Sequence, residues 1–216
     1  MGADEGRKGT KRQGGGGSQS SGRRPSGRSE VVEAIIDSAR ALFGERSPSR
    51  VPLREIAERA GVNFGLVYQY VGSKENLVAQ VLQKTAANAA ERLSEAEDFD
   101  EALGQLMTFG DGTTVRMVAW SLLEGTEPSA LFGPSPVLAL LAGLARRDAS
   151  RDGRSITEEE AGLVAALAMV MVMGWRLFGA AALAASGLDV TSMPLYDTLV
   201  ARCVSLAGLA PSQTRL

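Results

Sequence analysis

The chain has 216 residues, a formal net charge of −2 and an apolar fraction of 44%, which is ordinary for a globular protein. It contains no histidine and a single cysteine, Cys203. This excludes Ser-His-Asp and Cys-His catalysis, histidine-based metal sites and an intrachain disulfide bond. We therefore expect a protein that is not an enzyme and holds no metal or cofactor. The lone cysteine and a basic N-terminus without an apolar run predict a cytoplasmic location.

Charge is distributed unevenly along the chain. Residues 1–28 hold seven basic and two acidic side chains, residues 29–74 balance, and residues 75–216 carry a net charge of −7. The first segment is also rich in glycine and serine, so we predict a disordered basic tail over residues 1–28. Such a tail can act as an arm on DNA phosphates or simply keep the protein soluble, and the sequence leaves both interpretations open.

The first helical pattern starts where the tail ends. Ser29 is a candidate N-cap, apolar residues recur at helical spacing over 32–43, and Gly44 ends the pattern. A second helix is predicted to begin with Pro52 at its first position and to end at Gly61, a candidate left-handed C-cap.

Two further helices follow closely. Asn63 is a good N-cap for a short third helix that reaches Tyr70 and breaks at Gly72. Ser73 then caps a fourth helix that should extend to about Ala96.

The rest of the chain also has helical patterns, with no sustained alternation of the kind that strands show. The predicted breaks between these helices lie at residues 110–112, 125–128, 133–136 and 152–155. Thr157 and Glu160 form a capping box before a long apolar helix that should end near Gly187. A last helix is expected over residues 194–209. The fold class is therefore predicted to be all-α.

The long apolar helix raises the question of a membrane. Residues 161–175 are uncharged, but fifteen residues fall short of the roughly 20 that a spanning helix needs, and Arg176 then interrupts the run. We predict a core helix and no membrane insertion. Because the segment is apolar nearly all round, it needs cover on more than one side, which its own core and a partner subunit can supply together.

Residues 54–70, REIAERAGVNFGLVYQY, carry the pattern that indicates function. Two short helices are joined by a tight turn, and small inward residues such as Ala57 and Ala60 let them approach closely. Val67 and Val71 complete the core of a three-helix unit. A unit of this kind projects its last helix into the major groove of DNA.

On the outer side of the third helix we expect Phe64, Gly65, Tyr68 and Gln69. Tyrosine and glutamine can bond phosphates or base edges, and glutamine can pair with adenine. Gly65 would let a phosphate approach the backbone. Leu66 either touches thymine methyl groups or packs on neighbouring helices.

The start of the fourth helix, Ser73–Lys74, offers free backbone N–H groups, the positive end of the helix dipole and a full charge, all of which suit a phosphate.

The segment 60–82, AGVNFGLVYQYVGSKENLVAQVL, resembles the signature of the TetR family. The resemblance covers residues 29–82. It implies a homodimeric repressor with a helix-turn-helix DNA-binding domain, here residues 29–74, and a larger helical domain for effector binding and dimerisation, here residues 75–216. It also implies that the DNA-contact positions are Asn63, Phe64, Gly65, Tyr68, Gln69, Tyr70, Ser73 and Lys74.

Three positions depart from the family pattern. Val51 stands where a phosphate-contacting Thr or Ser is frequent, so Arg50 or Arg54 is expected to substitute. Phe64 replaces a polar residue, which changes base recognition, and Val71 replaces a larger phenylalanine.

The C-terminal half is expected to dimerise through its last two long helices and to bind a small effector. Large, adaptable apolar side chains suit an apolar ligand, although each of them can equally be plain core. The candidates are Met107, Met117, Trp120, Met173, Trp175 and Phe178. Arg116 and Arg176 lie among apolar neighbours, where they can meet an anionic ligand or pair with an acidic side chain.

Together these features predict a ligand-responsive repressor that a small, largely apolar effector releases from a palindromic operator. The alternative is a helical scaffold or protein-interaction module that does not bind an operator. The sequence does not separate repressor from activator.

Overall fold

The computed structural model describes residues 25–108 and 112–187, and within these ranges all regular structure is helical. The predicted all-α fold is confirmed. The elements are α1 Arg28–Glu45, a short 3-10 helix η1 Pro48–Arg50, α2 Leu53–Ala60, α3 Phe64–Val71, α4 Lys74–Leu93, α5 Phe99–Thr108, α6 Thr113–Leu123, α7 Pro128–Leu131, α8 Pro136–Arg151 and α9 Glu158–Ala185. Residues 1–24 of the predicted tail and the helix expected over 194–209 lie outside the described residues.

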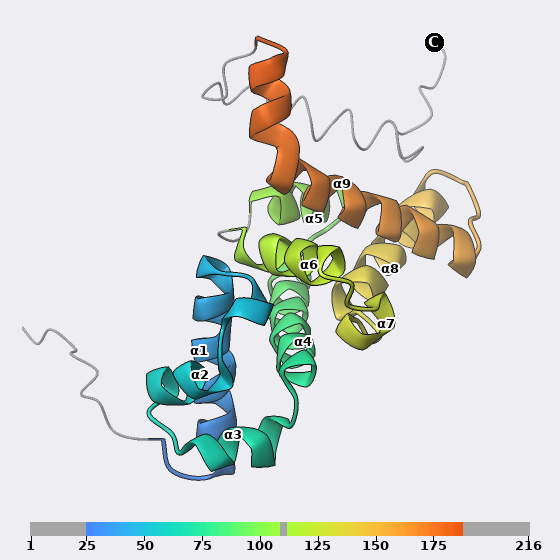
Figure 1. The fold of residues 1–216 in the computed structure, drawn as a ribbon. Coiled ribbons are helices and arrows are strands. Elements are labelled where there is room, and N and C mark those ends of the chain that lie inside the picture. The colour runs from blue at the N-terminus through green and yellow to red at the C-terminus, as the bar shows by residue number, and fades with distance from the viewer. Residues whose placement is uncertain (1–24, 109–111, 188–216) are drawn as a thin grey trace, which may run out of the picture.

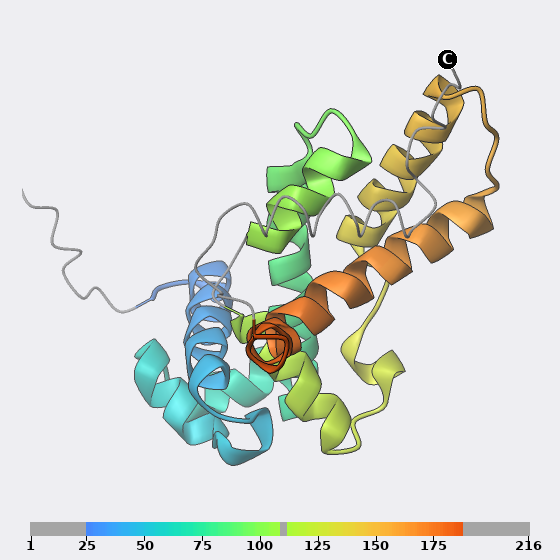
Figure 2. The ribbon, with the colours of Figure 1, turned by 90° about the horizontal axis from the view of Figure 1, so that it is seen from above.

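The helices form two connected groups. The three N-terminal helices lie at one end of the molecule, and α4 runs from this end into the other group (Figure 1). In the second group α9 lies across α8 (Figures 1 and 2). Its C-terminal turns extend away from the other described helices (Figure 1). α3 therefore lies at the end opposite to α9.

The first core joins the N-terminal helices to α4. Ile35 and Phe43 of α1 and Val67 of α3 have no exposed surface, and Leu77 of α4 is equally buried among them. Met117 of α6 belongs to the same cluster. The start of α4 and the middle of α6 are thus packed against the helices that carry α3.

The second core lies between α5, α8 and α9. Phe99 and Leu103 of α5 and Leu141 of α8 are buried together, and the small residues Ala165 and Ala168 give α9 a close approach to them.

Local chemistry explains most helix ends, with three differences from prediction. α1 begins two residues early, with Gly27 rather than Ser29 at its N-cap, and the Glu30 carboxylate in its first turn accepts a hydrogen bond from the backbone N–H of Ser26. Pro52 is the N-cap of α2 rather than its first residue; it has no N–H to lose there. α4 ends at Leu93, not near Ala96.

The capping box of α9 forms as predicted. The Thr157 hydroxyl accepts from the Glu160 N–H at 3.1 Å, and the Glu160 carboxylate accepts from the Thr157 N–H at 2.7 Å. These hydrogen bonds hold the pKa of Glu160 below its usual value. The box starts a 28-residue helix, longer than local propensity alone would secure.

One side of α9 is packed and the opposite side is not. Its packed face includes Ala161, Ala165 and Val172, whereas Leu167 is 51% and Val170 is 66% exposed. By length and mean hydropathy, 1.9 over its most apolar window, this helix would be long and apolar enough to cross a membrane, a test that core helices of soluble proteins also pass. Residues 25–108 and 112–187 therefore leave an apolar face of α9 uncovered.

Candidate nucleic-acid interface

The turn between α2 and α3 fixes the angle at which α3 leaves the core. Gly61 adopts a left-handed conformation with φ 66°, and the next N–H, that of Val62, donates back to the Ala57 carbonyl at 3.0 Å. Asn63 then caps α3, its side-chain oxygen accepting from the Gly65 N–H at 2.8 Å. Both ends of the turn are closed by local bonds, as predicted, so the two helices form a helix-turn-helix.

α3 has an inner and an outer side. Val67 and Val71 are buried in the first core, whereas Tyr68 is 56% exposed, and Gln69 and Gly65 are also exposed. The expectation that this helix presents polar groups outward is confirmed. Leu66 packs partly buried against the first core, the second of its two interpretations.

Phe64 is half-buried and contacts two other candidate residues. Its ring meets that of Tyr68 edge-on, with centroids 5.1 Å apart, and the Arg54 guanidinium lies 5.8 Å from its centroid. A cation so close to an aromatic face is attracted by the ring quadrupole. Phe64 therefore lies between the basic side chain of Arg54 at the start of α2 and the phenol of Tyr68 on the outer side of α3.

The start of α4 faces the same way. Ser73 caps it, the hydroxyl accepting from the Asn76 N–H at 3.2 Å, and the Lys74 ammonium donates to the Ser49 carbonyl at 3.1 Å. The pKa of Glu75 lies below its usual value because its own backbone N–H and the Ser73 side chain hydrogen-bond the carboxylate, with a smaller effect of the Lys74 charge. An anion is therefore already favoured at this helix start.

These elements enclose an open groove of about 500 Å³, which we call the α3–α4 groove. It is lined by Pro52, Leu53, Arg54, Phe64, Tyr68, Ser73, Lys74 and Glu75. Five of the nine predicted DNA-contact residues line this one groove, although they come from three helices and the cap that precedes α4. Leu53 and Glu75 were missed by sequence reasoning, since neither residue type signals a phosphate site.

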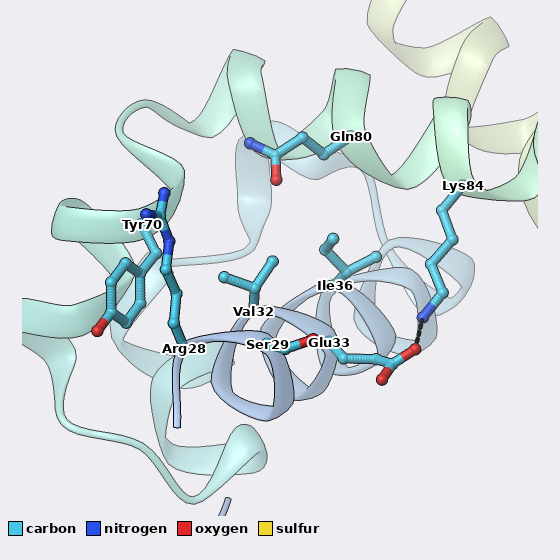
Figure 3. A pocket seen from close by; sticks show the side chains of 8 residues that line it. All are labelled: Arg28, Ser29, Val32, Glu33, Ile36, Tyr70, Gln80 and Lys84. Carbon is cyan, nitrogen blue, oxygen red and sulfur yellow. Dashed lines mark hydrogen bonds and ion pairs between the residues drawn. The ribbon is translucent and has the colours of Figure 1, made fainter. Parts of the chain in front are cut away.

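Tyr70 lies elsewhere. It is packed partly buried at the edge of a second groove of about 640 Å³, with the Arg28 guanidinium 5.6 Å from its ring centroid. Figure 3 shows this groove, with Val32 and Ile36 along it. The structure thus separates Tyr70 from the α3–α4 groove. Arg28 was assigned to the basic tail over residues 1–28, whereas the structure makes it the first residue of α1.

Lys84 closes the far side of the second groove. Its ammonium bonds Asp37 at 2.8 Å and Glu33 at 3.3 Å, which ties α4 to α1. Figure 3 shows the bond to Glu33. Burial lowers the pKa of Lys84, but the bonds to these two carboxylates raise it more, so the net shift is upward.

Comparison with known proteins places the chain in a family. The family model described as "Bacterial regulatory proteins, tetR family" matches residues 35–81, the segment from α1 into α4 that holds the helix-turn-helix. The HTH-type transcriptional repressor Rv3405c of Mycobacterium tuberculosis is 34% identical over 165 residues, which cover 76% of this chain and 82% of that protein. The chain belongs to the TetR family.

Solved structures agree with this on the fold. Salmonella enterica GusR superposes with a TM-score of 0.60 at 16% identity, covering 82% of this chain and 95% of its own. A tetR-family transcriptional regulator from Streptomyces coelicolor gives a TM-score of 0.51 at 22% identity, covering 85% and 84%. The TetR membership confirms a DNA-binding transcriptional regulator, of a family that is typically homodimeric and soluble.

In this TetR-family chain the predicted effector residues are distributed over both cores. Met117 is buried in the first core, with Met173 against it, and Met107 is buried in the second, with Trp175 against it. The indole of Trp175 also covers Gly179. The remaining two are Trp120, half-buried, and Phe178, 67% exposed. None of the six lines either of the two grooves described above.

The two arginines predicted to lie among apolar residues donate to main-chain carbonyls. Arg176 reaches the carbonyl oxygens of Leu106 and Met107 at 3.1 and 3.3 Å, near the end of α5. Arg116 reaches the Gly44 carbonyl at 3.2 Å. A cation near the last carbonyls of a helix compensates its dipole, so Arg176 has a structural task at α5.

Proposed function

We propose that this TetR-family regulator is a homodimeric repressor that grips a palindromic operator through the outer side of α3 and the start of α4, and that a small, largely apolar effector releases it. One observation carries the DNA-binding part. Tyr68, Lys74 and the capped N-terminus of α4, with its positive dipole end, border one open groove at the end of the molecule. Hydroxyl, ammonium and helix N-terminus are three groups that bind phosphate.

The groups in and beside the α3–α4 groove divide into two tasks. Ser73, Lys74 and Arg54 supply phosphate contacts, which are independent of sequence and position the protein. Tyr68 and Gln69 reach the base edges, where glutamine pairs best with adenine. Gly65 leaves room for the DNA backbone beside α3. Asn63 supports this surface indirectly, because its side chain caps α3.

The uncovered face of α9 supports the homodimer. Leu163, Leu167, Val170 and Phe178 leave apolar surface exposed along one side of the helix. A second copy of the chain is the natural cover, since a twofold interface uses the same patch on both subunits. Two copies of α3 about 34–36 Å apart would then meet successive major grooves on one face of a palindrome.

Large apolar side chains in the C-terminal half support an apolar effector. Met107, Met173 and Trp175 are large, adaptable side chains of the two cores. The nearby cation Arg176 already binds the main chain of α5. An uncharged molecule that wedges between α5 and α9 would bind without an unpaired charge and would shift the equilibrium toward a release-competent state.

The test of the DNA-binding part uses duplex DNA that the wild-type protein selects from a random-sequence pool. Tyr68→Ala and Lys74→Ala should each weaken binding about tenfold or more, measured by fluorescence anisotropy, with an unchanged helical circular dichroism spectrum. Lys74→Ala should also reduce the salt dependence, since two phosphate contacts per dimer are lost.

Arg146→Ala is the matched control, because it removes an exposed charge from α8, far along the chain from the groove. Unchanged affinity in both groove variants would contradict the assignment. A wild-type protein that selects no DNA at all would favour the helical scaffold instead.

A further inference from the structure

A short chain of contacts connects α6 to Lys74 through η1 and its N-cap Ser47, which together we call the η1 loop. Glu124, the residue after α6, accepts hydrogen bonds through Oε1 from the hydroxyls of both Ser47 and Ser49. Ser47 is only 7% exposed and caps η1, its oxygen accepting from the Ser49 N–H at 3.3 Å. The carbonyl of Ser49 in turn accepts from the Lys74 ammonium at 3.1 Å. Residues far apart in the sequence thus meet in a line that ends at the α3–α4 groove.

Glu124 occupies a position that α6 itself disfavours. It is the C-cap of the helix, where the dipole is negative, and the last turn of α6 holds no basic residue. A carboxylate there is destabilising unless something outside the helix compensates it. The two serine hydroxyls of the η1 loop supply that compensation. The residue is therefore matched to the loop and not to its own helix, and such local conflicts often mark a functional position.

The Lys74 ammonium benefits from being held. It has three donors, and the bond to the Ser49 carbonyl uses one of them, which leaves two for a phosphate in the α3–α4 groove. A lysine side chain is otherwise flexible and loses much rotamer freedom when it binds. Fixing it before DNA arrives removes part of that cost.

α6 is also fastened at its other end. A Cβ on Gly44 would lie 2.9 Å from the Thr113 side chain, so the last turn of α1 approaches α6 closely. The Arg116 guanidinium donates to the Gly44 carbonyl at 3.2 Å. Both ends of α6 therefore contact the segment that runs from the end of α1 to the η1 loop. A shift of α6 must move this segment or break these bonds.

We propose that Glu124 is a positioning residue for Lys74, and that α6 sets DNA affinity through the contact chain Glu124–η1–Lys74. This inference rests on the proposed function, because it takes Lys74 as a phosphate contact. When α6 is displaced, the carboxylate leaves the two hydroxyls, the η1 loop loosens and the ammonium is no longer held. DNA affinity then falls although no DNA-contacting residue has changed.

The direction in which Glu124→Ala changes DNA affinity separates this proposal from a simple effect of net charge. Removing an acidic residue from a DNA-binding protein should strengthen DNA binding by charge alone. We expect Glu124→Ala to weaken binding to the selected duplex about three- to tenfold, the range for losing one fixed side chain. Glu124→Gln keeps an oxygen that accepts from the serines and should stay close to wild type. Glu127→Ala, an exposed acid at the N-cap of α7, is the control and should bind as well as wild type or slightly better.

A double-mutant cycle with Lys74 tests the route. If Glu124 acts through Lys74, adding Glu124→Ala to Lys74→Ala costs no further affinity, and the salt dependence of Glu124→Ala shifts toward that of Lys74→Ala. A merely structural loss would instead add to the effect of Lys74→Ala and leave the salt dependence unchanged. Additive effects, or tighter binding by Glu124→Ala, would overturn the inference.

The DNA contact of Lys74 and the positioning role of Glu124 can be tested separately. If Lys74→Ala leaves binding to the selected duplex intact, the DNA-contact assignment is wrong, and the contact chain has no function to serve. If Lys74→Ala weakens binding but Glu124→Ala does not, the proposed function stands and the positioning role of Glu124 is refuted.

Discussion

Gly65 has a different physical role from the glycines of the turns. It lies inside α3 with ordinary helical dihedrals, and a Cβ there would meet only the Asn63 side-chain oxygen, at 3.3 Å. A glycine inside a helix costs about 0.5–1 kcal/mol relative to alanine. In return, the missing side chain leaves space beside the backbone on the outer side of α3.

We predict that Gly65→Ala separates folding from binding. The free energy of unfolding in urea should stay within about 1 kcal/mol of wild type, because the helix gains propensity while the cap is slightly crowded. Affinity for the selected duplex should fall about tenfold, since a methyl group holds the DNA backbone away.

The matched control is Gly104→Ala, a glycine inside α5 with no atom near its added Cβ. It should leave DNA binding unchanged. If Gly65→Ala binds DNA like wild type, close approach at this residue is not required.

At the scale of single elements, α9 depends on its first turn. Its capping box is formed by Thr157 and Glu160, and three acidic residues occupy the first turn, where the helix dipole favours them. This end of α9 packs in the second core through Ala165 and Ala168. Loss of the box should therefore loosen the face that α9 presents to a partner.

We predict that Thr157→Ala lowers the free energy of unfolding by about 1 kcal/mol at pH 7, measured by urea denaturation. The Glu160 pKa is depressed in the folded state, so its contribution is present at pH values above the ordinary 4.5 and is lost as pH falls through the folded pKa. The difference between Thr157→Ala and wild type should shrink at acid pH. Thr157→Ser keeps the hydroxyl and should behave like wild type; an equal loss in both variants would contradict the capping account.

The sequence predicts those elements whose ends are set by interactions between residues close together in the chain. The ends at Gly61, Asn63 and Ser73 are set by cap bonds within five residues, and all three were predicted. The η1 helix was missed although Ser47 and Pro48 are a local signal for a helix start. Its contact with Glu124, which lies 75 residues from Ser49, has no local signal and was also missed. The outer face of α3 followed from periodicity.

Other parts of the site depended on tertiary packing. Tyr70 was assigned to the DNA face with Tyr68, but two positions along α3 turn it to the other groove, beside Arg28. The effector residues were chosen by type, and type alone does not decide which of two cores a methionine enters. Met107 and Met117 accordingly lie in different clusters.

At the scale of the whole molecule, the proposed interface on the exposed face of α9 would link assembly to DNA binding. Two recognition helices on one duplex bind far more tightly than one, because the second contact is intramolecular. Breaking the proposed α9 interface should therefore abolish operator binding without touching α3.

We predict that Val170→Glu converts the dimer to a monomer, because a charge is placed in a buried apolar interface. Sedimentation velocity measures the mass, and anisotropy should show at least about a hundredfold weaker binding to the selected duplex. Ser155→Glu, in the exposed loop before α9, is the control and should remain dimeric. A Val170→Glu protein that stays dimeric would move the interface away from this face.

The most direct measurement of the central claim is lysine acetylation of the wild-type protein with and without the selected duplex, quantified by mass spectrometry. Lys74 borders the α3–α4 groove, whereas Lys84 is engaged by Asp37 and Glu33 at the second groove and serves as the internal reference. We predict that DNA protects Lys74 strongly and leaves Lys84 unchanged. Equal labelling of Lys74 in the free and DNA-bound protein would contradict the claim that this groove is the DNA-binding surface.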